Sequence, residues 1–331
     1  MALDVRVRIN QASVAGKASF GIPLFLITKG AAAVAYTEYD RSAFADAFAD
    51  NTDVGKAGRL LFAQDNAPIK IAVCTSTSTA VAAIAEVVGK NWRQLFVFKG
   101  DGDTSTDKAI SDAIAETTDK VLFLNISAAS ELTAIKANNG GGRTFAFLYP
   151  SKTYGVAAVI GATAGLDIGS FTYKNIKIKG LDPVSTLTDT AITELHTNGG
   201  NTLLLKAGDI VISEGKTVDG EYLDVVDSKD WIAQKIAYNT QKLLNNEPKL
   251  PYTNAGIASL ESVTEGVLKE AYDKGMIDTD DDGAPRFSVS FKSRSEMSAE
   301  DIRNRTYTGG NFFFALAGAI HDADIYGELV V

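Results

Sequence analysis

The sequence predicts an α/β fold: an N-terminal α/β layer domain plus an α+β C-terminal domain, with N- and C-terminal strand arms. Over residues 21–165, short apolar runs of the kind buried in a parallel sheet alternate with helical segments. Two long amphipathic helices follow, and both chain ends alternate apolar and polar side chains, which is typical of half-buried strands. We expect arms at residues 1–20 and 322–331, and domains at residues 21–185 and 186–321.

Length and composition are ordinary for a globular protein. The chain has 331 residues, of which 45% are hydrophobic and 22% charged, so it can bury two cores. Its net charge of −9 disfavours nucleic acid as the main partner. No apolar run reaches the roughly 20 residues of a membrane span, and we expect no signal peptide. The single cysteine, Cys74, excludes an internal disulfide and fits synthesis in a reducing cytoplasm.

The N-terminal arm reads as a strand on a soft linker. Its apolar residues alternate with polar ones and share one face: Leu3, Val5, Val7 and Ile9. Small residues follow at positions 12–19. Such a strand pairs either with its own chain or with another chain.

The α/β domain is expected to form a parallel sheet with right-handed crossovers. The apolar runs predict strands over residues 24–28, 69–74, 95–98, 121–124 and 145–149. Helices are expected over residues 41–48, 54–64, 79–89, 106–116, 129–137 and 154–164. In an enzyme of this fold, the chemistry would lie at the carboxyl ends of the strands.

Those strand ends carry no recognisable chemical motif. None has a phosphate-binding Gly-rich turn or a dinucleotide fingerprint, and the loop at residues 100–103 is acidic and would repel phosphate. The one nearby base, His196, lies on a polar helix beyond the domain. We therefore predict no catalytic, cofactor-binding or metal residues. Residues 278–283 resemble the start of a calcium loop, but Val289 stands where a glutamate is required, so an acidic solvated turn is the better interpretation.

Residues 166–217 connect the two domains. Alternating apolar residues over 171–178 predict a strand with an irregularity near Asn175. A helix is expected over residues 189–197, followed by strands over residues 202–205 and 209–212 joined by a turn at Gly208.

Two amphipathic helices organise the C-terminal domain. Asp227 is predicted to cap the first, with Asp230 in its first turn. One stripe of this helix is apolar and should be buried: Ile232, Ala233, Ile236, Ala237, Thr240, Leu243 and Leu244. The second helix repeats the pattern with Leu260, Val263, Val267, Leu268 and Ala271, and ends near Gly275.

The opposite face of the first helix presents two aromatic side chains and two cations. They are spaced i, i+4, i+7 and i+11: Trp231, Lys235, Tyr238 and Lys242. Two interpretations stay open. The face is either a contact surface or a solvated face whose aromatic rings are covered by a neighbouring loop.

The rest of the C-terminal domain alternates between strands and turns. Residues 287–291 predict a strand, Ser298 caps a short helix, and residues 311–320 are too apolar to be exposed. The closing arm again has residues that share one side: Ile325, Gly327, Leu329 and Val331.

Several blocks of the last third together resemble one protein family. They are Asp219-Gly220-Glu221-Tyr222-Leu223-Asp224-Val225-Val226, Asp230-Trp231-Ile232, Pro251-Tyr252-Thr253, Ala255-Gly256-Ile257, Phe312–His321 and Ile325–Val330. The pattern is similar to that of the tail sheath subunits of contractile phage tails, in the short, Mu-like type that also occurs in tailocin-like particles. The likeness is weak before this region.

This resemblance implies a structural protein, not an enzyme, without cofactor or metal. Such subunits polymerise as a helical stack of hexameric rings around an inner tail tube, exchange their terminal strands with neighbours, and contract to drive the tube through a cell envelope. The resemblance implies that the tube protein, the baseplate and the tail terminator are partners, and that the chain neither binds nucleic acid nor inserts directly into a membrane. It also implies that the chain is made in the bacterial cytoplasm and then forms part of the virion tail. The alternatives are an α/β enzyme or nucleotide-binding protein, and another phage structural protein.

Overall fold

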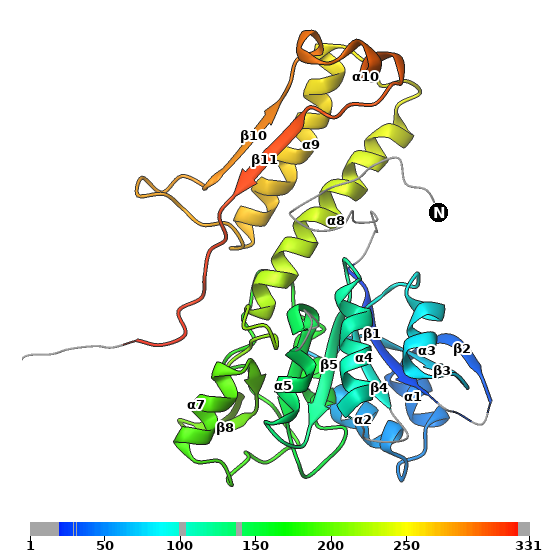
Figure 1. Cartoon of the computed structure of the whole chain (residues 1–331), viewed down its shortest axis with the longest axis vertical. Helices are drawn as coiled ribbons and strands as arrows, with labels where there is room; N and C mark the ends of the chain where they lie inside the picture. Colours follow the sequence, from blue (N-terminus) through cyan, green and yellow to red (C-terminus); the bar gives the residue numbers. More distant parts are fainter. Residues whose placement is uncertain (1–19, 29, 31, 99–103, 137–140, 324–331) are drawn as a thin grey trace, which may run out of the picture.

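The computed structural model describes residues 20–28, 30, 32–98, 104–136 and 141–323. The chain forms a lower α/β part and an upper helix-and-hairpin part, joined by one long helix, α8 (Leu223–Asn246) (Figure 1). All eight predicted strand residues of the two arms lie outside the described residues: Leu3, Val5, Val7, Ile9, Ile325, Gly327, Leu329 and Val331.

A seven-stranded sheet forms the centre of the lower part. Its order is β2-β3-β1-β4-β5-β6-β7; β2 runs antiparallel to β3, and all other neighbours are parallel. The strands are β1 (Ile22–Ile27), β2 (Val34–Asp40), β3 (Lys70–Thr75), β4 (Trp92–Phe98), β5 (Val121–Ile126), β6 (Thr144–Leu148) and β7 (Gly200–Asn201). The predicted parallel sheet is therefore confirmed.

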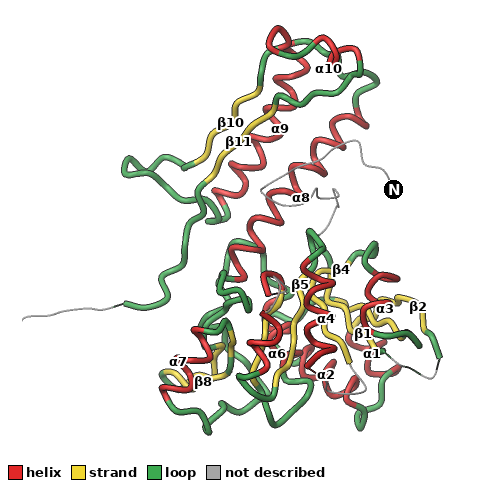
Figure 2. Tube along the Cα trace, viewed as in Figure 1, coloured by secondary structure: helices red, strands yellow, loops and turns green. Residues whose placement is uncertain are grey.

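Helices cover both faces of this sheet (Figure 2). Phe25 points to the face covered by α1 (Arg41–Ala47), α2 (Asp53–Phe62) and α6 (Val156–Thr163). Its neighbours Leu24 and Leu26 point to the opposite face. That face is covered by α3 (Ala80–Val87), α4 (Thr104–Ala115), α5 (Glu131–Lys136) and α7 (Asp189–Thr197). Burial on both faces explains why these strands read as continuous apolar runs.

Two local predictions for this part need correction. The sequence analysis missed β2, because its side chains are mostly exposed at the edge of the sheet and give no apolar run. The irregularity predicted near Asn175 is confirmed by a positive φ of 67° at that residue. The strand predicted over residues 171–178 does not form, and only one isolated bridge joins Lys177 to Val211. The helix at residues 189–197 and the hairpin of β8 (Leu203–Lys206) and β9 (Asp209–Ile212) are confirmed.

The upper part has a core of its own. Along α8, Ile232, Ala233, Ile236 and Ala237 are buried as predicted, whereas Leu243 and Leu244 are half-buried near the helix end. The four buried residues pack against α9 (Asn254–Asp273) and against the hairpin of β10 (Phe287–Phe291) and β11 (Gly310–Phe314). The short helix α10 (Ala299–Arg303) begins at the predicted cap, Ser298.

The start of α8 differs from the prediction. Asp227 does not cap the helix, because α8 begins one turn earlier, after Tyr222. Leu223 and Val226 are buried in the core of the α/β part, and their burial extends the helix into it. Asp227 and Asp230 consequently lie inside the helix and are themselves buried.

Among the described residues, none of the helices is both long enough and apolar enough to cross a bilayer.

Candidate assembly site

The hairpin of β10 and β11 is a sheet of only two strands. Phe287 pairs with Phe314 and Phe291 with Gly310, in antiparallel register. Within the described chain each of these strands has one neighbour, so each presents one unpaired edge. A free edge of backbone amides and carbonyls is a template for another strand.

One face of the hairpin is covered and the other is open. Phe287, Val289, Phe312 and Phe314 are partly buried against the core beneath α8 and α9. Phe313 points outward with 57% of its surface exposed. The prediction that residues 311–320 are not exposed is wrong for residues 311, 313 and 318–320, because a two-stranded sheet and its exit segment have only one covered face. Ile320 is 89% exposed.

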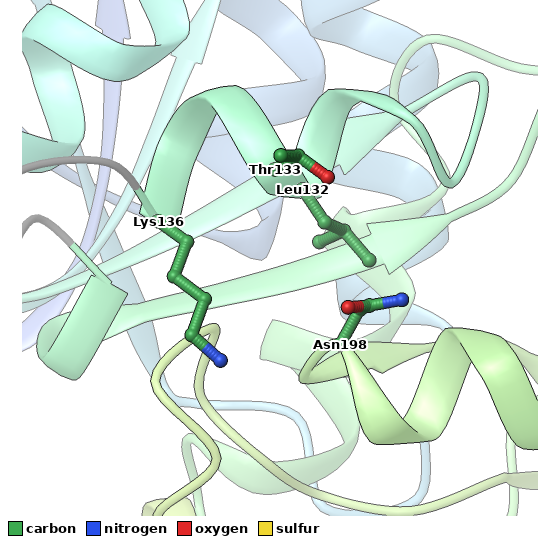
Figure 3. A pocket seen from close by; sticks show the side chains of 4 residues that line it. All are labelled: Leu132, Thr133, Lys136 and Asn198. Carbon is green, nitrogen blue, oxygen red and sulfur yellow. The ribbon is translucent and has the colours of Figure 1, made fainter.

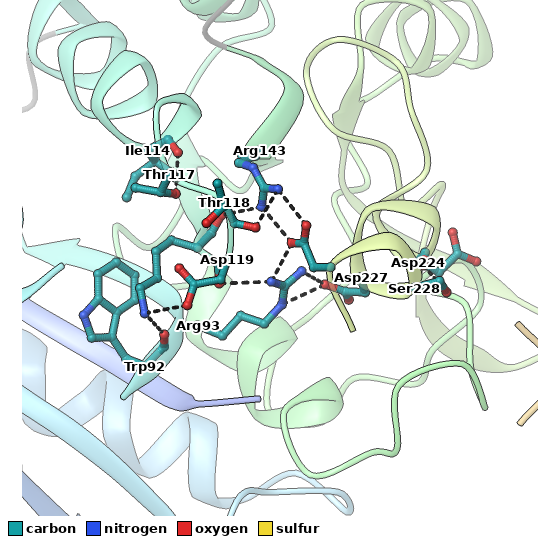
Figure 4. A network of polar contacts seen from close by, with 12 residues as sticks. Trp92, Arg93, Ile114, Thr117, Thr118, Asp119, Arg143, Asp224, Asp227 and Ser228 are labelled. Atoms are coloured by element: carbon teal, nitrogen blue, oxygen red, sulfur yellow. Dashed lines mark hydrogen bonds and ion pairs between the residues drawn. The ribbon is translucent and has the colours of Figure 1, made fainter. Parts of the chain in front are cut away.

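A buried network of charges fastens the base of α8 to the α/β part (Figure 4). Asp230 accepts hydrogen bonds from Arg93 Nη1 at 2.8 Å and from Arg143 Nη1 and Nη2 at 2.7 Å each. Asp227 accepts from Arg93 Nε at 2.9 Å and from the Tyr173 hydroxyl at 2.9 Å. Both aspartates come from α8, whereas Arg93 lies at the start of β4 and Arg143 immediately precedes β6.

The aspartates of the network shift the pKa values of the buried Arg93 and Tyr173 side chains. Burial by itself would lower the pKa of the Arg93 guanidinium, but Asp227 and Asp230 raise it above its ordinary value. Burial and the Asp227 carboxylate raise the pKa of the Tyr173 hydroxyl well above 10.0, so it stays a donor. Buried ion pairs hold only when their remaining protons are satisfied. Here the backbone carbonyls of Thr118, Asp119 and Lys120 accept three further guanidinium protons.

Sequence reasoning missed this network. Asp227 and Asp230 sit where helix caps are common, and their arginine partners are more than 80 residues away in the chain. One sequence pattern could have predicted it. The two aspartates are spaced i and i+3 on one helix face beside the apolar stripe, so their carboxylates lie close to the buried side of the helix. Phe20, the first described residue, lies with its ring 4.2 Å from the Arg93 guanidinium carbon, so the end of the N-terminal arm also reaches this network.

The predicted contact face of α8 lies partly against its own chain. Lys235 pairs with Glu270 of α9 at 3.1 Å, and its ammonium lies 5.2 Å from the centre of the Trp231 ring. Tyr238 is half-buried and Lys242 is exposed. Trp231 is partly buried against the core of the upper part. A role of this face in binding another protein stays a prediction.

One hollow in the described surface offers little chemistry. It has a volume of about 280 Å³ and lies between α5 and the end of α7, lined by Leu132, Thr133, Lys136 and Asn198 (Figure 3). This lining holds one cation and no carboxylate or imidazole with which that cation could work as an acid–base pair.

Two constellations resemble functional sites but have structural roles. His196 Nε2 lies 2.8 Å from Ser213 Oγ, and His196 Nδ1 lies 3.8 Å from the Glu214 carboxylate. Ser213 is only 1% exposed, however, and its hydroxyl oxygen accepts a hydrogen bond from the Thr202 amide. A substrate cannot reach this serine. In the acidic turn, the Asp280 carboxylate accepts the amides of Asp282 and Ala284, as expected for a solvated turn. No cluster of three or more potential metal ligands occurs in the described part of the chain.

Solved structures of contractile particles share this fold over its whole length. A chain of the anti-feeding prophage (AFP) baseplate, with sixfold symmetry applied, is 14% identical, with 100% of both chains covered and a TM-score of 0.70. A chain of the AFP helical sheath in the contracted state is 15% identical, covering 100% of this chain and 98% of that one, with a TM-score of 0.70. A chain of the contracted PVC sheath complex, from an extracellular contractile injection system, is 12% identical over 97% and 95%, with a TM-score of 0.71.

A bacterial protein adds to this group. A sheath tail protein of Listeria innocua is 12% identical over 91% of this chain and 96% of that one, with a TM-score of 0.58. The chain matches no protein-family model and no curated protein sequence. The chain therefore shares the fold of these structures. The mixed α/β fold that the sequence predicts is thus confirmed.

Proposed function

We propose that this chain is a structural subunit of a contractile tail sheath, not an enzyme. It polymerises helically around an inner tail tube by exchanging strands between subunits, and it contracts to drive the tube through a cell envelope. One observation carries the proposal. A chain that shares the fold of contractile sheath chains has a C-terminal hairpin that, among the described residues, leaves two strand edges unpaired and points Phe313 outward.

The terminal arms are the proposed occupants of those edges. The apolar face of residues 3–9 and that of residues 325–331 are as long as β10 and β11 or longer. Backbone hydrogen bonds would supply the affinity, and the alternation of side chains would set the register. Pairing with strands from two neighbours would turn the hairpin into a larger sheet and link the subunits into a mesh.

The rest of the molecule is suited to move as one body. The α/β part and the upper part are joined through α8, whose base is held by the buried Arg93, Arg143, Asp227 and Asp230 network. The arms would therefore accommodate the relative movement of subunits. Burial of additional surface between subunits would supply the free energy of contraction. The extended sheath would be a state of higher free energy that is held kinetically.

The partners and location follow from this role. They are further copies of the chain in a helical stack of hexameric rings, an inner tube protein, a baseplate and a tail terminator, all in a virion tail or tailocin-like particle. The sixfold baseplate that contains a similar chain supports such rings. Tyr238 and Lys242, with Trp231 and Lys235, remain our candidates for contact with the tube or with a neighbouring subunit.

The contact face can be tested by charge reversal. K235E/K242E should impair assembly on tubes, whereas K269E, which reverses an exposed lysine of α9, should not. Because K235E also breaks an exposed ion pair worth about 0.2–1 kcal/mol, the melting temperature of each variant serves as the folding control. Unchanged assembly of the double variant would exclude this face.

Electron microscopy of the purified full-length chain tests the main proposal. We expect tubes or rings. V5S/V7S, which removes the apolar face of the N-terminal arm, should abolish them while leaving a folded monomer. R6S/R8S on the opposite face is the matched control and should still polymerise. Equal polymerisation of both variants, or a wild-type chain that stays monomeric at high concentration, would contradict strand exchange.

A further inference from the structure

The chain leaves the C-terminal hairpin along a segment with two separate attachments. Just after β11, the Ala315 amide donates to Arg286 O and the Ala317 amide donates to Met276 O, both at 2.9 Å. Residues 318–320 are exposed, with Ile320 reaching 89%. The chain then descends beside the base of α8, where the described part ends at residue 323 (Figure 1).

The second attachment begins at His321. Its Nε2 lies 3.0 Å from the hydroxyl oxygen of Thr172, in the irregular segment that precedes the β8–β9 hairpin. Its ring meets the ring of Tyr222 edge to face, with centroids 4.5 Å apart and planes at 80°. Tyr222 is the residue that precedes α8. An edge-to-face pair and a polar contact together fix the orientation of the imidazole ring.

Asp322 completes the attachment through a buried lysine. Its carboxylate lies 3.0 Å from Lys174 Nζ, and the Lys174 side chain is only 6% exposed. Lys174 is also held by Glu214 at 3.3 Å, which in turn accepts from Lys216 at 2.9 Å and from the Tyr222 hydroxyl at 3.1 Å. Asp322 therefore meets a cation that is already immobilised. Such a pair loses less side-chain entropy than a pair of two mobile surface groups.

We propose that His321 and Asp322 form a clasp, with Thr172, Lys174 and Tyr222 as its receiving residues, that fixes where the C-terminal arm leaves the body. The C-terminal arm then leaves the body at Asp322, not at the end of β11. Tyr173, between two of the receiving residues, donates to Asp227 of the buried network. The clasp thus ties the arm to the rigid base of α8.

The clasp has a consequence for assembly. This inference rests on the proposed strand exchange. An arm that starts from a fixed point samples a smaller volume, which raises its effective concentration at the edge of a neighbour's hairpin and lowers the entropy lost on pairing. Opening the clasp would add several free residues to the tether, including the exposed stretch at 318–320, and so weaken pairing without removing any strand contact.

The clasp is tested on the unassembled full-length chain, isolated by size exclusion. Limited thermolysin cleavage followed by mass spectrometry reports access to the bonds around Ile320. We expect H321S/D322N to speed this cleavage about threefold to tenfold, which corresponds to about 0.6–1.4 kcal/mol. D324N removes the same charge two residues later and is the matched control. Equal cleavage of the wild type and H321S/D322N would overturn the clasp.

The role in assembly is read from the critical concentration for polymerisation. H321S/D322N should raise it severalfold and D324N should leave it unchanged. Faster cleavage with an unchanged critical concentration would overturn the role of the clasp in pairing. Failure of strand exchange itself is a distinguishable result, because it would show in the V5S/V7S and R6S/R8S comparison and not in cleavage of the unassembled chain. Circular dichroism confirms that each variant is folded.

Discussion

The buried network at the base of α8 gives the sharpest quantitative prediction. Asp230 is 0% exposed and accepts three charge-assisted hydrogen bonds from Arg93 and Arg143. D230A would remove all three, so that Arg93 keeps only Asp227 as a carboxylate partner and Arg143 keeps only backbone carbonyl acceptors among the described residues. Breaking a buried ion pair by removing one partner costs about 3–5 kcal/mol. Because domains are commonly stable by only about 5–15 kcal/mol, the loss should be large.

Urea unfolding of the unassembled chain, followed by circular dichroism at pH 7, measures this loss. We expect D230A to lower the free energy of unfolding by about 3–5 kcal/mol. D46A removes an exposed aspartate from α1 and should change that free energy by no more than about 0.5 kcal/mol.

A double-mutant cycle adds a test of the pairing itself. If Arg143 and Asp230 act together, R143A/D230A should lose less than the sum of the two single variants. A loss below about 1.5 kcal/mol in D230A, or strict additivity in the cycle, would refute the view that this network fastens α8 to the sheet.

Three further predictions concern single side chains. Burial alone would raise the pKa of Glu214, but Lys216 and Lys174 lower it from 4.5 to about 2. Because the folded-state pKa is the lower one, the stabilisation by Glu214 is present above pH 4.5 and is lost towards pH 2. The difference in unfolding free energy between wild type and E214Q should therefore close over that range, and a constant difference in acid unfolding would argue against it. G161A places a methyl group about 2.7 Å from the Leu61 Cα where α6 crosses α2, and should cost about 1–3 kcal/mol in urea unfolding, whereas G266A, in open space on α9, should stabilise by about 0.5–1 kcal/mol. Burial lowers the pKa of His321 below 6.5, and the Lys174 ammonium lowers it further. K174M should therefore raise the His321 pKa in an NMR titration of the two histidines. An unchanged His321 pKa would mean that the imidazole ring lies away from Lys174.

The sequence determined the layered part of the fold because its signals are local. Strands buried on both faces must be apolar throughout, so five of the seven sheet strands stand out as runs between helical segments. The helix at residues 189–197 and the cap at Ser298 follow from side chains that bond their own backbone. β2 was not predicted, because an exposed edge strand has no continuous apolar run.

Only the tertiary structure decided how the two parts are joined and what is left uncovered. Asp227 looked like a helix cap, yet burial of Leu223 and Val226 extends α8 and carries the aspartate to Arg93, a partner 134 residues earlier in the chain. The apolar stretch after residue 310 looked like core, yet the hairpin has one covered face and leaves Phe313 in solvent. Local periodicity indicates which side chains become buried, whereas the contacts that bury them join residues far apart in sequence.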